Sequence, residues 1–234
     1  MALQRIPLVL AESLKMSLIL YGHPFSSYTQ KVLIALYENA TPFELRCLGP
    51  DTPEHVDEWL RRWPLAMMPL LVDGERDIAE SSIIIEHLQL TRPGPVRLLP
   101  QDAQAALDVR FLDRFFDLHV MNMMQRAVFG ALSGDPIKRR DGLASACEKL
   151  GLSYAWLDRH LERRPWAAGS DFTLADCAAA PALFYADWTY QIPERFAALR
   201  AYRARLLARP SFARAVEEAR PFRPNFPLGA PDRD

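Results

Sequence analysis

LILYGHPFSSYTQKVLIALYE, residues 18–38, is the stretch that decides the fold. Its apolar run Leu18–Tyr21 is bounded by Gly22 and Pro24, which predicts a short strand buried on both faces. After a polar turn, apolar residues recur at spacings of three and four, and they predict a helix over residues 28–38 with one face on a core. The stretch therefore predicts a strand–turn–helix unit.

The turn of this unit places two hydroxyls, those of Ser26 and Ser27, beside the first N–H groups of the helix. The unpaired N–H groups and the dipole at such a helix start favour negative charge. Two interpretations stay open from this stretch alone. Either a serine only caps the helix, or a hydroxyl steadies a bound anion or thiolate.

The composition argues against several classes of protein. The chain has 234 residues, enough for one large domain or two small ones, and half of them are apolar. A net charge of −1 argues against a nucleic-acid surface, and the lack of any apolar run of about 18 residues argues against a membrane span. The three cysteines have no metal-ligand or redox spacing and give no disulfide framework, so a reducing, cytoplasmic location fits best.

Residues 1–15 precede the strand–turn–helix unit and do not fit its pattern. Arg5 followed by IPLVLA is similar to a signal peptide, but the apolar run is shorter than such segments require. We therefore expect a loosely ordered N-terminal extension, or a true start at Met16, directly before the strand.

Five more elements complete a mixed α/β pattern. Residues 42–48 alternate as a strand does, residues 54–63 have helical character, and residues 81–90 predict another helix. Asp73-Gly74, between MPLLV and ERDIA, is a strong signal for a two-residue hairpin. The predicted order is β-α-β-α-β-β-α, a small mixed sheet with helices packed on it.

The segment TRPGPVRLLP, residues 91–100, holds three prolines and a glycine and marks the clearest boundary in the chain. We expect a first domain over residues 16–93, a linker over residues 94–100, and a second, all-helical domain over residues 101–220. The Pro-rich tail of residues 221–234 is expected to extend over the surface. The helices predicted in the second domain cover residues 101–132, 139–161, 173–188, 193–208 and 211–219.

This arrangement of domains resembles a cytosolic glutathione S-transferase, from about Ser17 to Pro221. The resemblance implies an α/β plus all-α fold, in which a thioredoxin-like N-terminal domain is followed by the family's all-helical C-terminal domain. It also implies glutathione as the co-substrate, no metal, and a homodimer that acts in detoxification in the cytoplasm.

Two dipeptides of the first domain support the resemblance. Met68-Pro69 stands where the family keeps a cis-proline, which implies that the Met68 N–H and C=O face the cleft and bind the cysteinyl backbone of glutathione. Glu80-Ser81 stands where the family holds the γ-glutamyl end, so that Glu80 would pair with the ammonium and Ser81 with the carboxylate. Without the resemblance, Pro69 would be interpreted as an ordinary proline at the start of a strand, and Glu80-Ser81 as a helix cap.

A third motif, FTLAD at Phe172–Asp176, resembles the family's buried helix start in the second domain. Thr173 and Asp176 have the spacing of a capping box, with Asp in place of the usual Glu. We expect its role to be structural.

The resemblance places the residue that meets the glutathione sulfur in the first turn, where three residues compete. Counting back from Val32, Ser26 aligns with the first serine of the theta and zeta patterns and is our preferred catalytic residue. Ser27 is its neighbour, and His23 lies where omega-type members keep a cysteine. The serine would donate a hydrogen bond to the thiolate and would not itself be the nucleophile. Because the turn has no cysteine, thiol–disulfide exchange by an enzyme sulfur is excluded there.

Three functions follow from these residues. The leading hypothesis is conjugation of the glutathione thiolate to a small hydrophobic electrophile. The second is a zeta-type, glutathione-dependent maleylacetoacetate isomerase, although Tyr28 replaces that class's cysteine and Gln30-Lys31 replaces its Trp-Arg. The third is a non-catalytic member of the fold that binds glutathione or a partner protein.

Overall fold

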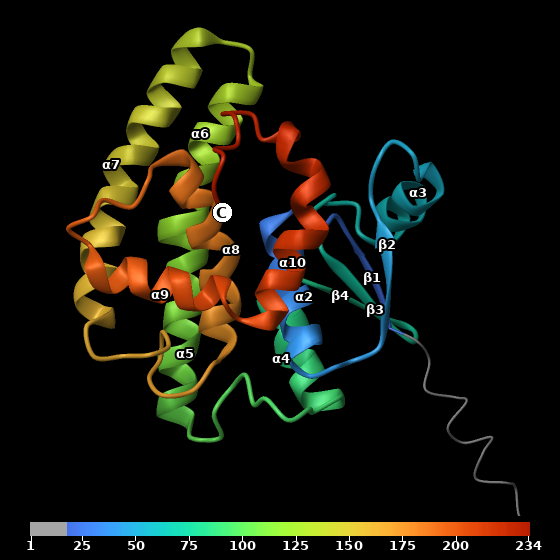
Figure 1. Cartoon of the computed structure of the whole chain (residues 1–234). Coiled ribbons are helices and arrows are strands. Elements are labelled where there is room, and N and C mark those ends of the chain that lie inside the picture. The colour runs from blue at the N-terminus through green and yellow to red at the C-terminus, as the bar shows by residue number, and fades with distance from the viewer. Residues whose placement is uncertain (1–17) are drawn as a thin grey trace, which may run out of the picture.

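The computed structural model describes residues 18–234. The extension expected over residues 1–15 lies outside the described residues. The first domain follows the predicted order of elements, which is confirmed (Figure 1). Its elements are β1 (Leu18–Gly22), α2 (Ser27–Glu38), β2 (Phe43–Cys47), α3 (Pro53–Arg62), β3 (Leu70–Asp73), β4 (Arg76–Ala79) and α4 (Ser81–Thr91).

The four strands form one sheet in the order β2-β1-β3-β4, in which β2 is parallel to β1 and the other neighbours are antiparallel. Alternate residues of β1 enter different cores, as predicted for a strand buried on both faces. Leu18 and Leu20 pack into the large core shared with the helical domain, whereas Tyr21 packs with Trp59 of α3 on the other face. Figure 1 shows α2 and α4 between the sheet and the helical domain, with α3 on the far side.

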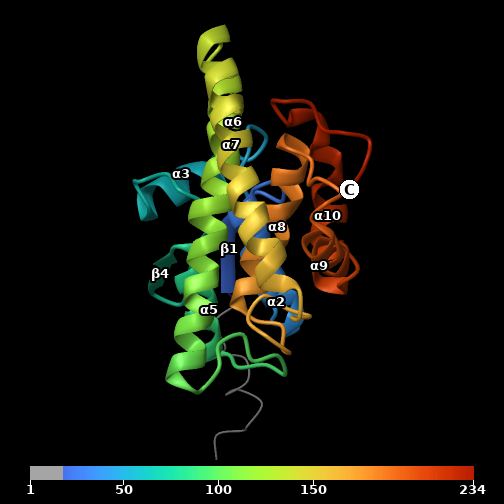
Figure 2. The ribbon, with the colours of Figure 1, turned by 90° about the vertical axis from the view of Figure 1, so that its left-hand side faces the viewer.

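The named elements of the second domain are all helices. Its elements are α5 (Ala103–Phe115), η1 (Phe116–Met121), α6 (Asn122–Leu132), α7 (Pro136–Leu161), α8 (Leu174–Thr189), α9 (Ala197–Leu207), α10 (Pro210–Ala219) and η2 (Arg220–Asn225). Figures 1 and 2 show the α6–α7 pair projecting beyond the other helices. Among residues 18–234, no helix is both long and apolar enough to cross a bilayer.

Helix α8 is the centre of this domain, since every residue from Leu174 to Trp188 is buried. At the start of α8, Asp176 Oδ2 accepts a hydrogen bond from the Thr173 N–H at 2.8 Å, as predicted for the capping box. The Asp176 carboxylate also accepts from the Ala167 N–H at 2.8 Å and from the Tyr202 hydroxyl at 2.6 Å. The motif therefore anchors a loop and a second helix besides capping α8.

The long helical pattern predicted over residues 101–132 is confirmed, because α5, η1 and α6 follow one another without a break; η1 is a π-helical turn within it, where Asp117 contacts Lys31. One expectation for the helical part was wrong. The tail over residues 221–234 does not simply extend over the surface. Its first residues continue α10 as the 3-10 helix η2, and Phe226 is buried against Tyr185 and Trp188.

Candidate active site

The three segments singled out in the first domain meet at one edge of the sheet. Tyr21 of β1 pairs with Leu70 of β3, and Leu70 pairs with Ala79 of β4, so these residues form one row across three strands. Adjacent strands lie about 4.8 Å apart. The segments just beyond this row are the turn after β1, Met68-Pro69 before β3 and Glu80-Ser81 after β4, which therefore lie side by side.

Ser26 is the N-cap of α2. Its Oγ accepts a hydrogen bond from the Thr29 N–H at 3.3 Å, and its backbone is extended, as in other N-caps. Because Oγ is the acceptor in this bond, its own hydrogen remains available to a group in front of the helix. Capping the helix and donating to an anion are thus compatible roles for the same hydroxyl.

The two alternative residues of the turn are less favourably placed. Ser27 is the first residue of α2 and is only 9% exposed, whereas Ser26 is half-buried. His23 accepts from the Phe25 N–H through Nδ1 at 3.1 Å and packs edge-on against the Phe222 ring. Burial lowers the pKa of His23, so at neutral pH the imidazole is uncharged and adds no positive charge to the turn.

Two buried residues, Gln30 and Tyr185, hydrogen-bond the backbone of the turn after β1. The sequence analysis did not identify them as part of the site. Gln30 Nε2 donates to Pro24 O at 2.9 Å and to the Tyr185 hydroxyl at 3.0 Å. The Tyr185 hydroxyl donates in turn to Phe25 O at 3.0 Å. Tyr185 belongs to α8, so the helical domain fixes the backbone of the turn directly.

The Met68-Pro69 peptide bond is cis, as the resemblance implied. Pro69 is buried and Met68 is half-buried. Within residues 18–234, the Met68 N–H and C=O have no hydrogen-bond partner. Both groups are therefore available to the backbone of a bound peptide.

Glu80 is the N-cap of α4 and lies at φ +67°, a left-handed conformation that costs a residue with a side chain about 1–2 kcal/mol. Such local strain is concentrated at functional sites. Glu80 is exposed, and Ser81, the first residue of α4, is buried beneath it. A carboxylate and a helix N-terminus thus stand together at the sheet edge.

Behind these segments lies a buried charge network that connects the two domains. Lys31 of α2 is 1% exposed, and its Nζ lies 2.5 Å from Asp113 Oδ1, 2.9 Å from Asp117 Oδ2 and 2.9 Å from Ser82 Oγ. Arg114 adds a second cation against Asp113, Asp117 and Ser82. Burial raises the pKa of Asp117, and the charge of Lys31 opposes that rise. Two cations balance two carboxylates between α2, α4, α5 and η1.

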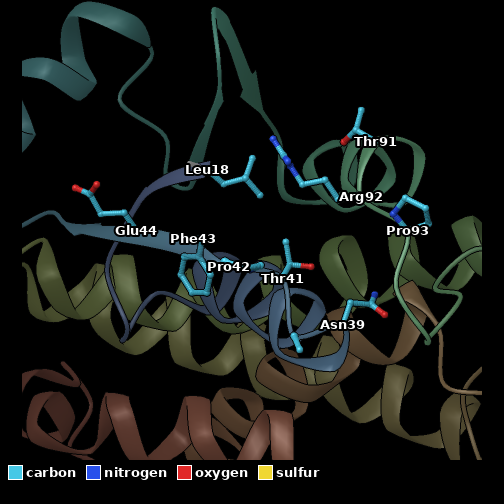
Figure 3. Close-up of a pocket in the computed structure, with 10 residues that line it drawn as sticks. Leu18, Asn39, Thr41, Pro42, Phe43, Glu44, Thr91, Arg92 and Pro93 are labelled. Atoms are coloured by element: carbon cyan, nitrogen blue, oxygen red, sulfur yellow. The ribbon is translucent and has the colours of Figure 1, made fainter. Parts of the chain in front are cut away.

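A pocket of about 690 Å³, whose lining residues Figure 3 draws, lies at the opposite end of the sheet. It is lined by Leu18 at the start of β1, Asn39 after α2, and Arg92 after α4. These positions are the far ends of the elements that carry Ser26 and Glu80, so this pocket is separate from the candidate site. Within residues 18–234, no cluster of three or more His, Cys, Asp or Glu side chains could hold a metal ion.

Comparison with known proteins explains this arrangement. Residues 20–96 match the family described as "Glutathione S-transferase, N-terminal domain", and residues 140–205 match "Glutathione S-transferase, C-terminal domain". A probable maleylacetoacetate isomerase of Vibrio cholerae is 30% identical over 220 residues, which cover 88% of this chain and 98% of that protein. The chain belongs to the glutathione S-transferase family.

Two further relatives match most of the chain. Glutathione S-transferase GstB of Escherichia coli is 28% identical over 70% of this chain and 81% of its own. FtsZ-localized protein A of Caulobacter vibrioides is 28% identical over 82% of this chain and 88% of its own.

Solved structures of the family share the fold. Gtt2 of Saccharomyces cerevisiae has a TM-score of 0.73 at 24% identity and covers 84% of this chain and 99% of its own. A glutathione transferase homologue from Drosophila mojavensis, solved with bound glutathione, has a TM-score of 0.74 at 22% identity and covers 88% of this chain and 94% of its own.

Proposed function

We propose that this glutathione S-transferase family member activates the thiol of glutathione as a thiolate, which attacks a small hydrophobic electrophile. The observation that carries the proposal is the meeting of the Ser26 cap, the cis Met68-Pro69 bond and Glu80-Ser81 at one sheet edge. Glu80 would pair with the γ-glutamyl ammonium and Ser81 with the carboxylate of the same residue. The unpaired Met68 backbone groups, preceding Pro69, would bind the cysteinyl backbone.

The role of Ser26 is to hold the thiolate and not to take its proton. A free thiol has a pKa near 8.5, so a fall of about two units makes the thiolate the main form at pH 7 and needs about 2.7 kcal/mol. A hydroxyl donor and the N-terminus of α2 contribute about 1 kcal/mol or more each. The thiol proton leaves to water, so no neighbouring base is required.

Isothermal titration with millimolar glutathione tests whether the protein binds glutathione, on which the proposal depends. We expect binding, and we expect Glu80→Gln to weaken it because one partner of the ammonium loses its charge. Glu75→Gln, an exposed residue of the β3–β4 turn, serves as the matched control. If the protein binds no glutathione, the enzymatic proposals fail together.

A zeta-type isomerase is the second candidate, and it is favoured by the 30% identity to the probable maleylacetoacetate isomerase of Vibrio cholerae. Tyr28 in place of that class's cysteine weighs against it. Glutathione-dependent isomerisation of maleylacetoacetate, measured beside conjugation of a haloalkane, separates the two functions. A non-catalytic binding role is third, and it would be supported by glutathione binding without turnover of any electrophile.

We further propose a homodimer in the cytoplasm. Four large apolar side chains on α4 and α5 are each more than half exposed, namely Ile83, Leu90, Leu107 and Phe111. The Glu86–Arg110 ion pair joins the two helices at 2.8 Å. Sedimentation of the wild type and of Phe111→Glu tests this interface.

All three cysteines are unpaired, which supports a reducing compartment.

A further inference from the structure

The turn between α6 and α7 carries an exposed apolar cluster that the proposed function does not use. Phe129 and Leu132 lie on one side of α6, three residues apart, and Ile137 follows at the start of α7. Each of these side chains is more than half exposed. Figures 1 and 2 show this turn at the outer end of the projecting α6–α7 pair. We call this end, residues 126–140, the tip. Large apolar side chains gathered on a protein surface mark a contact with a partner or a membrane.

The backbone of the tip is held rigid by close helix packing. A Cβ at Gly130 would lie 2.5 Å from Lys138 O, and a Cβ at Gly142 would lie 2.6 Å from Arg126 O. The two helices therefore pack backbone against backbone. The turn between them contains Gly134 at φ +71°, a conformation that favours glycine. The apolar cluster is thus presented on a fixed, protruding surface.

The tip also carries positive charge that its own carboxylates do not neutralise. Asp135 is the N-cap of α7, where its Oδ1 accepts from backbone N–H groups. Asp141, just beyond the tip, pairs with Arg140 at 2.9 Å. Within residues 18–234, three exposed cations of the tip form no ion pair, namely Arg126, Lys138 and Arg139.

These cations stand directly behind the apolar cluster. Arg126 precedes Phe129 by three residues on α6, and Arg139 follows Ile137 by two residues on α7, which is about 3–5 Å along each helix. The surface of an anionic bilayer has the matching order, with hydrocarbon beneath a layer of negative phosphates. A protruding tip fits a deformable lipid surface, whereas a protein partner would need a groove of complementary shape.

We propose that the tip docks on the surface of an anionic lipid bilayer. Phe129, Leu132 and Ile137 enter the headgroup layer, and the three unpaired cations lie against lipid phosphates. This surface is separate from the apolar side chains of α4 and α5. Phe111 lies eighteen residues before Phe129 in the continuous α5–η1–α6 stretch, or about 27 Å along it. The inference therefore goes beyond the proposed transferase function and does not depend on it.

Flotation of the full chain with lipid vesicles tests the proposal. One set of vesicles is phosphatidylcholine alone, and the other contains phosphatidylcholine and phosphatidylglycerol in equal parts. We expect association with the anionic vesicles only, and release as salt is added, because salt screens exposed charges. Each Lys or Arg near an anionic surface strengthens binding about fivefold. Arg139→Gln should therefore weaken the partition to anionic vesicles about fivefold, and Leu132→Ser about tenfold.

Two variants near the other end of α7 are the matched controls. Leu152 is 64% exposed, the same fraction as Leu132, and Arg159 is exposed and forms no ion pair within residues 18–234, like Arg139. Leu152 and Arg159 both lie about 24 Å or more along α7 from its start. We expect Leu152→Ser and Arg159→Gln to leave the partition unchanged.

Several results would overturn the proposal. The wild type would fail to float with anionic vesicles, would float equally well with neutral ones, or would lose as much binding in the control variants as in the tip variants. Sedimentation supplies one more check. If Leu132→Ser dissociated a homodimer that Leu152→Ser left intact, the tip would be covered by a second copy of the chain, and the lipid assignment would be wrong.

Discussion

Lys31 offers the strongest test of the buried charge network. Replacing it with methionine keeps the length of the side chain and removes the cation that faces Asp113 at 2.5 Å and Asp117 at 2.9 Å. Removing one partner of a buried ion pair costs about 3–5 kcal/mol, because the remaining charge is left unpaired in a low dielectric. We expect Lys31→Met to lower the free energy of unfolding by about 4 kcal/mol at neutral pH.

Urea unfolding followed by circular dichroism measures this loss. With a slope of about 3 kcal/mol per molar urea, 4 kcal/mol moves the midpoint down by about 1.3 M. Lys138→Met, at an exposed position of α7, is the matched control, and surface substitutions of this kind stay within about 0.5 kcal/mol.

The loss in Lys31→Met also depends on pH with a defined sign. Burial already raises the pKa of Asp117, and removing Lys31 takes away a charge that opposes this rise. A carboxyl group whose pKa is higher in the folded than in the unfolded state destabilises the fold above that pKa, and the penalty is relieved as the pH falls through it. The cost of Lys31→Met should therefore shrink as the pH is lowered from neutral. A cost below about 1 kcal/mol, or one that grows as the pH falls, would refute the reasoning.

Two further variants test local features. Ala66 lies at φ +55°, where glycine is favoured, so Ala66→Gly should raise the free energy of unfolding by up to about 1 kcal/mol; an unchanged urea midpoint would count against strain at this position. Asp176→Ala removes the acceptor of Ala167, Thr173 and Tyr202 donors, and unpaired buried donors cost about 1–3 kcal/mol each. We expect a loss on the order of 4 kcal/mol by urea unfolding, against little change for the exposed Asp171→Ala.

Much of the fold is predictable from local pattern. The apolar strand β1 buried on both faces, the Asp73-Gly74 hairpin and the helical spacing after Ser26 each depend on neighbours in the sequence, and the structure confirms all three. The candidate site residues came from the family resemblance, which assigns Met68-Pro69 and Glu80-Ser81 to the ends of strands. The register of the sheet then brings them together.

The features that were missed depend on contacts between distant parts of the chain. Lys31 stands among apolar residues of α2, and only Asp113 and Asp117, more than 80 residues away, make its burial possible. Tyr185 lies within an apolar helix, and its role in holding the turn is invisible until α8 packs against α2. The proline-rich composition of the tail predicted an extended chain, but the Phe226 ring packs against the Trp188 ring of α8.

The central claim is that the Ser26 hydroxyl stabilises the glutathione thiolate at the start of α2. The most direct measurement is the pKa of bound glutathione, followed by the ultraviolet absorbance of the thiolate during pH titration of the complex. The account predicts that the pKa in Ser26→Ala rises by about one unit or more, whereas Ser27→Ala leaves it near the wild-type value. An unchanged thiolate pKa in Ser26→Ala, or a larger rise in Ser27→Ala, would contradict it.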